Sequence, residues 1–160
     1  MPFVLEQQHK SNWCWNAVSV SVQRYFDPSS TLTQEKFAVE ELGNVPDLDQ
    51  GFYLEDALTA LGKLDRRLPG ALTFADIQRE LMKGLPVCVH VAWYEGHSHY
   101  VVISGYRFSP AGDPQVMVSD PILPNSNIVV WDYNAFVFAY GPTYTNGEGY
   151  WEDTCLVEAR

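Results

Sequence analysis

Residues 86–93 read Pro-Val-Cys-Val-His-Val-Ala-Trp, and the hydrophobic pattern of the chain changes at this stretch. Its valines alternate with Cys88 and His90, so the two sets point to opposite faces, as they do in a β-strand. Before Pro86, apolar residues instead recur three and four positions apart, which is the spacing of an amphipathic helix. A helical first part followed by a β second part predicts an α+β fold.

Four segments N-terminal to this stretch have helical periodicity. We expect helices at residues 15–26, 33–42, 53–61 and 73–84. Ser11 or Asn12 should cap the first helix, and Thr73 with Asp76 forms a capping-box pattern at the start of the fourth. Helices should therefore account for most of the chain up to about residue 85.

The segments from residue 87 onward alternate in hydrophobicity and are separated by polar turns. We expect strands at residues 87–93, 99–108, 115–120, 128–132 and 149–157. The pair Asn146-Gly147 is a strong signal for a hairpin turn. This half of the chain should therefore form an antiparallel sheet.

Length and composition limit the number of domains. A chain of 160 residues that is 46% hydrophobic has the size of one domain with its own core. Its Pro and Gly residues are scattered, and we find neither a repeat nor a flexible linker. We expect one domain over residues 1–160, with a helical part at about 1–85 and a β part at about 86–160.

The charge balance limits the partners. Ten Lys and Arg against twenty Asp and Glu give a formal net charge of −10 at pH 7. Because phosphate backbones and anionic lipid surfaces attract basic proteins, we expect neither nucleic acid nor a membrane as a partner. No window approaches the roughly 20 apolar residues of a transmembrane helix. Residues 1–10 also lack the basic start and apolar run of a signal peptide.

The stretch Gln8-His9-Lys10-Ser11-Asn12-Trp13-Cys14-Trp15-Asn16-Ala17 places a cysteine in the first turn of a predicted helix. Unpaired N–H groups and the positive end of the helix dipole stabilise a thiolate there. The other two cysteines, Cys88 and Cys155, lie far away along the chain, so the set indicates neither a disulfide framework nor a CxxC metal site. Cys14 is therefore the candidate nucleophile.

A cysteine nucleophile needs an imidazole to exchange protons with it and a third group to orient that ring. His99 begins an apolar strand, whose pleat can hold the ring toward a neighbouring element. Asp120 ends a later strand, where a carboxylate can accept a hydrogen bond from the second ring nitrogen. We therefore interpret Cys14, His99 and Asp120 as a candidate catalytic triad.

Attack on a carbonyl also requires donors for the oxyanion that forms. Gln8 lies six residues before Cys14 and is our candidate, together with the Cys14 backbone N–H; Gln7 is the alternative at five residues. Trp13 and Trp15 flank the cysteine, and we expect them to line the substrate cleft and exclude water from it.

These residues resemble the papain-like cysteine peptidases. That family has Gln six residues before a Cys at a helix N-terminus, then His opening a strand and Asn or Asp at a later strand end, which Gln8, Cys14, His99 and Asp120 match in order. The flanking residues look most like the compact bacterial branches: plant-pathogen effector peptidases, staphopains and the bacteriocin-leader-processing domains of exporters. These motifs, taken in order, span residues 8–121.

The resemblance implies an N-terminal helical subdomain carrying Cys14, a C-terminal antiparallel β subdomain carrying His99 and Asp120, and a substrate cleft between them. It implies hydrolysis of a protein or peptide substrate through a thioester, with no metal or organic cofactor. We also expect a monomer. The effector branches suggest a bacterial toxin or effector that is secreted or delivered into a target cell, and a maturation protease inside its own cell is the alternative.

Two positions depart from the relatives. Asp120 stands where plant papain has Asn, which places the chain with the bacterial branches. Asn16 follows the Trp-Cys-Trp stretch where the effector branch often has Ala, and we interpret it as a change on the helix surface.

Other functions are compatible with parts of this pattern. The same triad serves transglutamination or deamidation of glutamine, which share the thioester and differ in acceptor or leaving group. A catalytically inactive peptide-binding module is a third class, although it has no chemical need for all four side chains.

Metal sites are the remaining alternatives. His90, His97 and His99 offer imidazoles for zinc, but this site requires an extended strand and leaves Cys14 unexplained. Residues 47–51 hint at a calcium loop, yet Gly51 takes a ligand position and no Glu closes the loop. We expect no metal, and an exposed acidic loop at 47–51.

Overall fold

A computed structural model describes residues 2–124 and 128–160. Within them the helices and strands are α1 (Cys14–Phe26), α2 (Gln34–Leu42), α3 (Leu54–Ala60), β1 (Leu64–Pro69), α4 (Phe74–Met82), β2 (Val87–Trp93), β3 (Ser98–Phe108), β4 (Pro114–Ser119), β5 (Ile128–Asp132), α5 (Tyr133–Ala139) and β6 (Gly149–Val157). The expected helices and strands are present, and β1 and α5 are additional.

The strands form one six-stranded sheet in the order β1-β6-β2-β3-β4-β5, and every neighbouring pair is antiparallel. The central strand β2 pairs with β3 through Val89 and Val101 and with β6 through Cys88 and Cys155. The α+β prediction is therefore confirmed.

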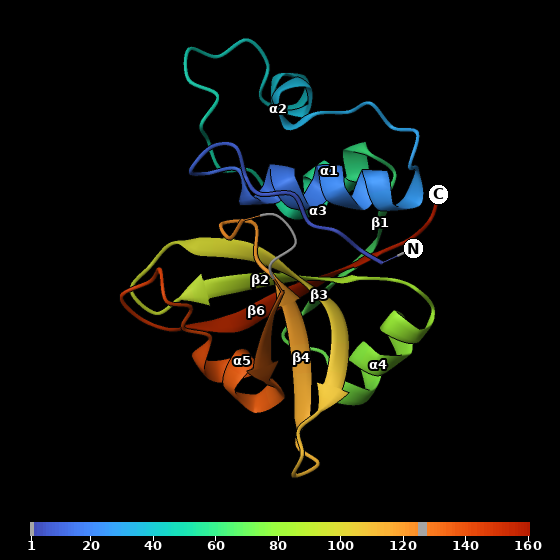
Figure 1. Cartoon of the computed structure of the whole chain (residues 1–160). Coiled ribbons are helices and arrows are strands. Elements are labelled where there is room, and N and C mark those ends of the chain that lie inside the picture. The colour runs from blue at the N-terminus through green and yellow to red at the C-terminus, as the bar shows by residue number, and fades with distance from the viewer. Residues whose placement is uncertain (1, 125–127) are drawn as a thin grey trace.

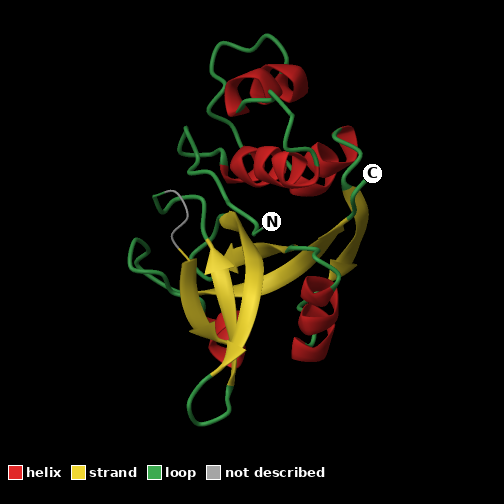
Figure 2. Cartoon of the chain, turned by 45° about the vertical axis from the view of Figure 1, so that its right-hand side comes forward, coloured by secondary structure: helices red, strands yellow, loops and turns green. Residues whose placement is uncertain are grey.

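Helices cover both faces of the sheet, as the two views show (Figures 1 and 2). Helices α1, α2 and α3 lie above it, where Trp15 and Leu58 share a buried cluster with Cys88 and Val102 of the sheet. Helices α4 and α5 lie against the other face, in a second cluster. The alternation along β2 produces this division, because its valines enter the second cluster and Cys88 enters the first.

The layers do not follow the expected division at residue 85. Strand β1 lies within the N-terminal part but pairs with β6, and α4 packs below the sheet rather than with α1–α3. Strand β1 escaped prediction because its residues 65–67, Asp-Arg-Arg, are polar and exposed, so it shows no hydrophobic alternation. The α5 segment is short and directly follows β5, which hides its periodicity.

The helix caps were predicted in part. Thr73 Oγ1 accepts a hydrogen bond from the Asp76 N–H at 3.1 Å, as the capping-box pattern indicated. The prediction for α1 was wrong, because its N-cap is Trp13 and no side chain caps it; Ser11 and Asn12 bond to another loop instead. The turn signal at residues 146–147 lies in the loop 141–148, which Tyr140 and Gly149 close with a bridge.

Among the described residues, none of the helices combines the length and apolar character required to span a bilayer.

Candidate active site

Cys14 is the first residue of α1, where the helical layer meets the sheet. The first i−4 bond of this helix runs from the Ala17 N–H to the Trp13 carbonyl, so the N–H groups of Cys14 and Trp15 precede the helical ladder. The backbone N–H groups of Trp15 and Tyr100 act to lower the pKa of the Cys14 thiol. The sulfur therefore lies among donors that favour its anionic form.

His99 lies near the start of β3 and is 4% exposed. Its Nε2 is 2.8 Å from Oδ1 of Asp120, which directs its other ring nitrogen to the hydrogen bond with Cys14. The Trp93 ring stacks on the imidazole at a centroid distance of 6.0 Å and an angle of 19°. Helix and sheet thus bring together side chains that are 85 residues apart in the sequence.

The pair has opposite pKa shifts. Burial acts to raise the pKa of the Cys14 thiol, but its hydrogen bond to His99 and the charge of the ring outweigh burial and lower it. Burial acts to lower the pKa of His99, and the bonds to Asp120 and Cys14 reverse this and raise it to about 10. The lowered pKa of Cys14 and the raised pKa of His99 both favour a thiolate facing an imidazolium. By contrast, burial raises the pKa of Cys88 and of Cys155.

Asp120 directly follows β4 and its side chain is fully buried. Oδ1 accepts from His99 and, at 3.1 Å, from the Ile122 N–H; Oδ2 accepts from the hydroxyl of Tyr140 at 2.8 Å and from that of Tyr144. Burial acts to raise its pKa, and the bond to His99 and the other donors lower it below 3.8. Sequence reasoning did not identify the two tyrosines, which no spacing rule connects to the triad.

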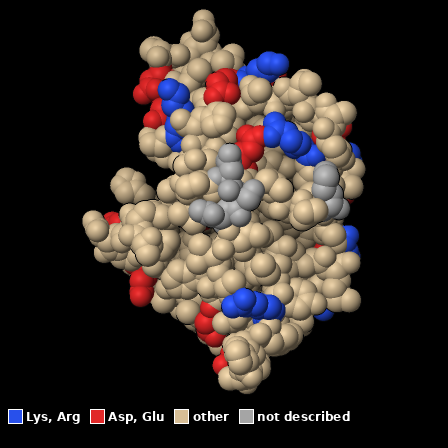
Figure 3. All heavy atoms as spheres, viewed as in Figure 1, with Lys and Arg blue, Asp and Glu red and all other residues tan. Residues whose placement is uncertain are grey.

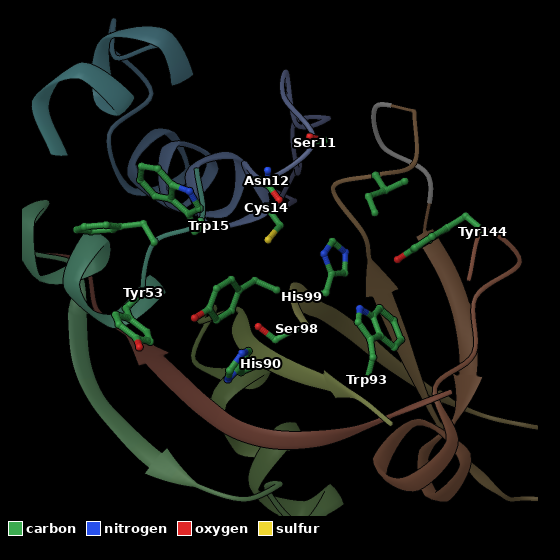
Figure 4. A pocket seen from close by; sticks show the side chains of 14 residues that line it. Ser11, Asn12, Cys14, Trp15, Tyr53, His90, Trp93, Ser98, His99 and Tyr144 are labelled. Atoms are coloured by element: carbon green, nitrogen blue, oxygen red, sulfur yellow. The ribbon is translucent and has the colours of Figure 1, made fainter. Parts of the chain in front are cut away.

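A cavity of about 660 Å³ opens beside Cys14 and His99. Trp15, Phe52, Tyr53 and Tyr100 supply aromatic walls, and Figure 4 shows Cys14 and His99 facing each other within it. The space-filling view is hollowed on the side where α1 begins, between the helical layer and the sheet (Figure 3).

Trp15 and Trp13 have different positions. Trp15 lines the cavity and its Nε1 donates to the Gln50 carbonyl at 3.0 Å. Trp13, which we expected in the cleft, is instead buried, and its Nε1 donates to the Leu48 carbonyl at 2.6 Å. Trp13 therefore fastens the start of α1 to the loop at residues 47–51.

Gln8 lies next to the triad without facing the cavity. Its backbone N–H donates to the Pro121 carbonyl at 2.7 Å, while its side-chain Nε2 donates to the carbonyls of Lys10 at 2.9 Å and Ser11 at 2.8 Å. These two acceptors fix the orientation of the amide. Gln8 is not among the described residues that line the cavity. Gln7, the alternative donor, bonds to the Ile122 carbonyl at 3.1 Å.

The acidic loop at residues 47–51 holds the segment before the cysteine. Asp49 accepts from the Ser11 hydroxyl at 2.5 Å and from the Asn12 N–H at 2.7 Å, and its carbonyl accepts from the Asn12 side chain. The bond from Ser11 in particular lowers the pKa of Asp49. This carboxylate is thus an anchor for the turn that leads into Cys14, a role that the exposed-loop interpretation missed.

Asn16 does not lie on the helix surface, contrary to our interpretation. It is fully buried, and its Nδ2 donates to the Gln34 carbonyl at the start of α2 at 2.8 Å. An amide at this position therefore ties α2 to α1, which an alanine cannot do.

The three histidines of the zinc alternative do not converge in the described part of the chain. His99 faces Asp120, and the one described cluster with metal-ligand spacing is His90, Glu152 and Asp153. Asp153 is also bonded to Arg67 at 2.8 Å, so a cation already pairs with one of the two carboxylates. The arrangement is that of an ion-pair network beside the cleft.

The α+β fold and a cleft holding a cysteine at a helix N-terminus against a histidine define a papain-like cysteine peptidase. The chain belongs to the Peptidase_C39-like family, whose model matches residues 2–153. It is therefore a cysteine peptidase, a hydrolase that acts on proteins or peptides. No curated protein matched the chain in a sequence search.

Proposed function

We propose that the protein hydrolyses peptide bonds through a Cys14–His99–Asp120 triad and a thioester intermediate. The observation that supports this most strongly is the chain of contacts from the Cys14 sulfur to His99 and, at 2.8 Å, to Asp120 inside a cleft. Nucleophile, base and orienting group occur in the order that such chemistry needs.

In the proposed cycle, the Cys14 thiolate attacks the scissile carbonyl carbon and His99 transfers its proton to the leaving amine. The C–N bond breaks and a thioester remains on Cys14. Neutral His99 then takes a proton from water, the hydroxide attacks the thioester, and the new carboxyl group leaves as the thiolate–imidazolium pair is restored. Asp120 holds the ring throughout without exchanging bonds.

The site that would bind the oxyanion is the least preformed part of the proposed mechanism. The Cys14 N–H lies at the helix start and is available without rearrangement. For the proposed Gln8 donor, the amide must leave the carbonyls of Lys10 and Ser11 when substrate binds. A Gln8→Ala variant should then lower kcat about 10²-fold with a smaller change in KM.

The cavity walls suggest the substrate chemistry. Among the described residues that line it, none is Lys, Arg, Asp or Glu, and aromatic rings dominate one side. We infer that an uncharged, apolar side chain lies beside the scissile bond. The net charge of −10 favours neutral or basic peptides over acidic ones, an effect that added salt should weaken.

The test is hydrolysis of a peptide mixture in H₂¹⁸O, followed by mass spectrometry, with Cys14→Ala as the inactive control. We expect new peptide C-termini that carry ¹⁸O in the wild type alone. Acyl transfer or deamidation would instead modify glutamine side chains with release of ammonia, and an inactive binding module would change no peptide. Either of these results contradicts the proposal.

We further propose that residues 1–160 act as one monomeric domain. A single sheet receives β1 from the N-terminal part, and the cluster above it combines side chains from α1, α3, β2 and β3. Sedimentation should give the 18.1 kDa monomer, and residues 86–160 expressed alone should not fold.

Delivery outside the producing cell, as a bacterial effector or toxin, is a proposal that rests on the resemblance to effector peptidases. Fractionation of the source culture tests it. Accumulation in the medium or in a target cell is expected, whereas retention inside the producer favours a maturation protease.

A further inference from the structure

The carboxylate of Asp120 has an unusually complete set of donors. Its outer oxygen, Oδ2, points away from His99 and accepts from Tyr140 at 2.8 Å and from Tyr144. Its inner oxygen, Oδ1, accepts from His99 and from the Ile122 N–H. A carboxylate offers about four lone-pair directions, so four donors leave no direction free for rotation.

The two tyrosines reach this carboxylate from one stretch of chain. Tyr140 directly follows α5, is 1% exposed, and packs between Trp93 and Phe136 at centroid distances of 5.9 and 5.0 Å. Tyr144 lies in the following loop, lines the substrate cavity and meets the His99 ring edge-on at 6.2 Å. Tyr140 is thus fixed in the core. Tyr144 borders the cleft (Figure 4).

We propose that Tyr140 and Tyr144 are positioning residues that hold Asp120 as an oriented anion, so that Oδ1 fixes the His99 ring toward Cys14. The inference rests on the proposed triad. Two donations to Oδ2 favour an ionised carboxylate, because a protonated Oδ2 would present its own hydrogen to one of the two hydroxyls. Loss of either hydroxyl leaves Oδ2 short of a donor and free to turn.

The titratable groups that face this carboxylate are few. His99 lies on β3, with Cys14 of α1 behind it, and the tyrosines lie on the side of α5 and its following loop. Burial, and then the negative charge of Asp120, hold the pKa of both tyrosines well above the usual range. Their hydroxyls therefore remain protonated donors throughout the pH range of activity.

The experiment is a titration of the Asp120 carboxyl carbon by ¹³C NMR in wild type, Tyr140→Phe and Tyr144→Phe, with the signal assigned by its loss in Asp120→Asn. A hydrogen bond to a charged group is worth enough that each variant should raise the pKa of Asp120 by about one unit. Tyr133→Phe is the matched control, since its hydroxyl donates to the Leu72 carbonyl at 2.7 Å, away from the triad.

Kinetics give the second readout. Tyr140 does not line the cavity, so Tyr140→Phe should lower kcat about tenfold and leave KM unchanged. An Asp120 pKa that is the same in wild type and both variants overturns the proposal, as does an equal rise in Tyr133→Phe. If Tyr140→Phe does not fold, Tyr144→Phe provides the test, because Tyr144 is only partly buried. The titration needs no substrate, so it separates failure of this inference from failure of the proposed peptidase mechanism.

Discussion

At the scale of single residues, Cys14 and His99 depend on each other for their charge. The thiol is acidified mainly by its bond to the ring, and the ring is made more basic by its bonds to Asp120 and to the thiol. The lowering of the Cys14 pKa would not survive the separation of the two side chains, whereas the bond to Asp120 would still favour the charged ring. Activation of the cysteine is therefore a property of the pair, and helix position alone does not supply it.

The first prediction concerns pH. The reactive thiolate–imidazolium pair exists above the lowered pKa of Cys14 and below the pKa of His99, which is raised to about 10. The kcat/KM for hydrolysis should therefore rise at a pH below the ordinary thiol pKa and fall only as pH passes about 10, in a bell-shaped profile. A fall centred near 6.5, the ordinary value for histidine, would contradict the cited shift.

The second prediction concerns Asp120. An Asp120→Ala variant should lose about 10²- to 10⁴-fold in kcat, because His99 loses the acceptor that fixes its tautomer and orientation. Cys14→Ala should abolish turnover, since no nucleophile remains. Circular dichroism checks that both variants fold. Full activity in Asp120→Ala would remove this carboxylate from the mechanism.

Cys14, His99 and Asp120, which the structure brings together, could be proposed from the sequence because each stands at the end of a recognisable helix or strand. Sequence reasoning did not locate Tyr140 or Tyr144, whose contacts with Asp120 depend on how the chain returns after α5. Such convergence is set by tertiary packing and leaves no periodic signal. Gln8 was predicted as an oxyanion donor, but the orientation of its amide could not be foreseen, since local carbonyls compete for it.

At the scale of secondary structure elements, the cap of α4 tests how the sequence sets helix boundaries. Thr73 accepts from the Asp76 N–H at 3.1 Å and its hydroxyl donates to the Asp76 carboxylate at 2.8 Å. A Thr73→Ala variant should lower the free energy of unfolding by about 1 kcal/mol in urea. Thr31→Ala, at an exposed position between α1 and α2, is the control and should change it little. Equal effects of the two variants would contradict the assigned cap.

Strand β1 shows where prediction of elements from the sequence stops. Helices α1–α4 and strands β2–β6 carry periodic apolar patterns, so they were expected with boundaries close to those observed. The exposed residues of β1 give no such pattern, and its pairing with β6 is a long-range backbone contact. Edge strands of this kind are specified by their partner more than by their own composition.

At the scale of the whole molecule, the two members of the proposed catalytic pair lie on different layers. Cys14 belongs to α1 and His99 to β3, and the buried cluster between helices and sheet sets their separation. Packing in that cluster is therefore linked to chemistry, because a small displacement of reacting groups is costly in rate.

Leu58 of α3 provides the test of that link. It is fully buried between the helical layer and the sheet, so Leu58→Ala should lower the free energy of unfolding by about 2–5 kcal/mol and also reduce kcat. Ile77→Ala makes a comparable cavity on the opposite face of the sheet, under α4. At a temperature where both variants are folded, Leu58→Ala should lose more activity. Equal losses of activity in the two variants would contradict a specific link between packing under the helical layer and catalysis.

The most direct test of the central claim is the intact mass of the protein after brief exposure to the cysteine-peptidase inhibitor E-64 near neutral pH. We predict one inhibitor per chain on Cys14, none in Cys14→Ala and much slower labelling in His99→Ala, while the buried Cys88 and Cys155 stay unmodified because their pKa values are raised. Labelling that is slow in the wild type and unchanged in His99→Ala would contradict an activated Cys14, and with it the proposed mechanism.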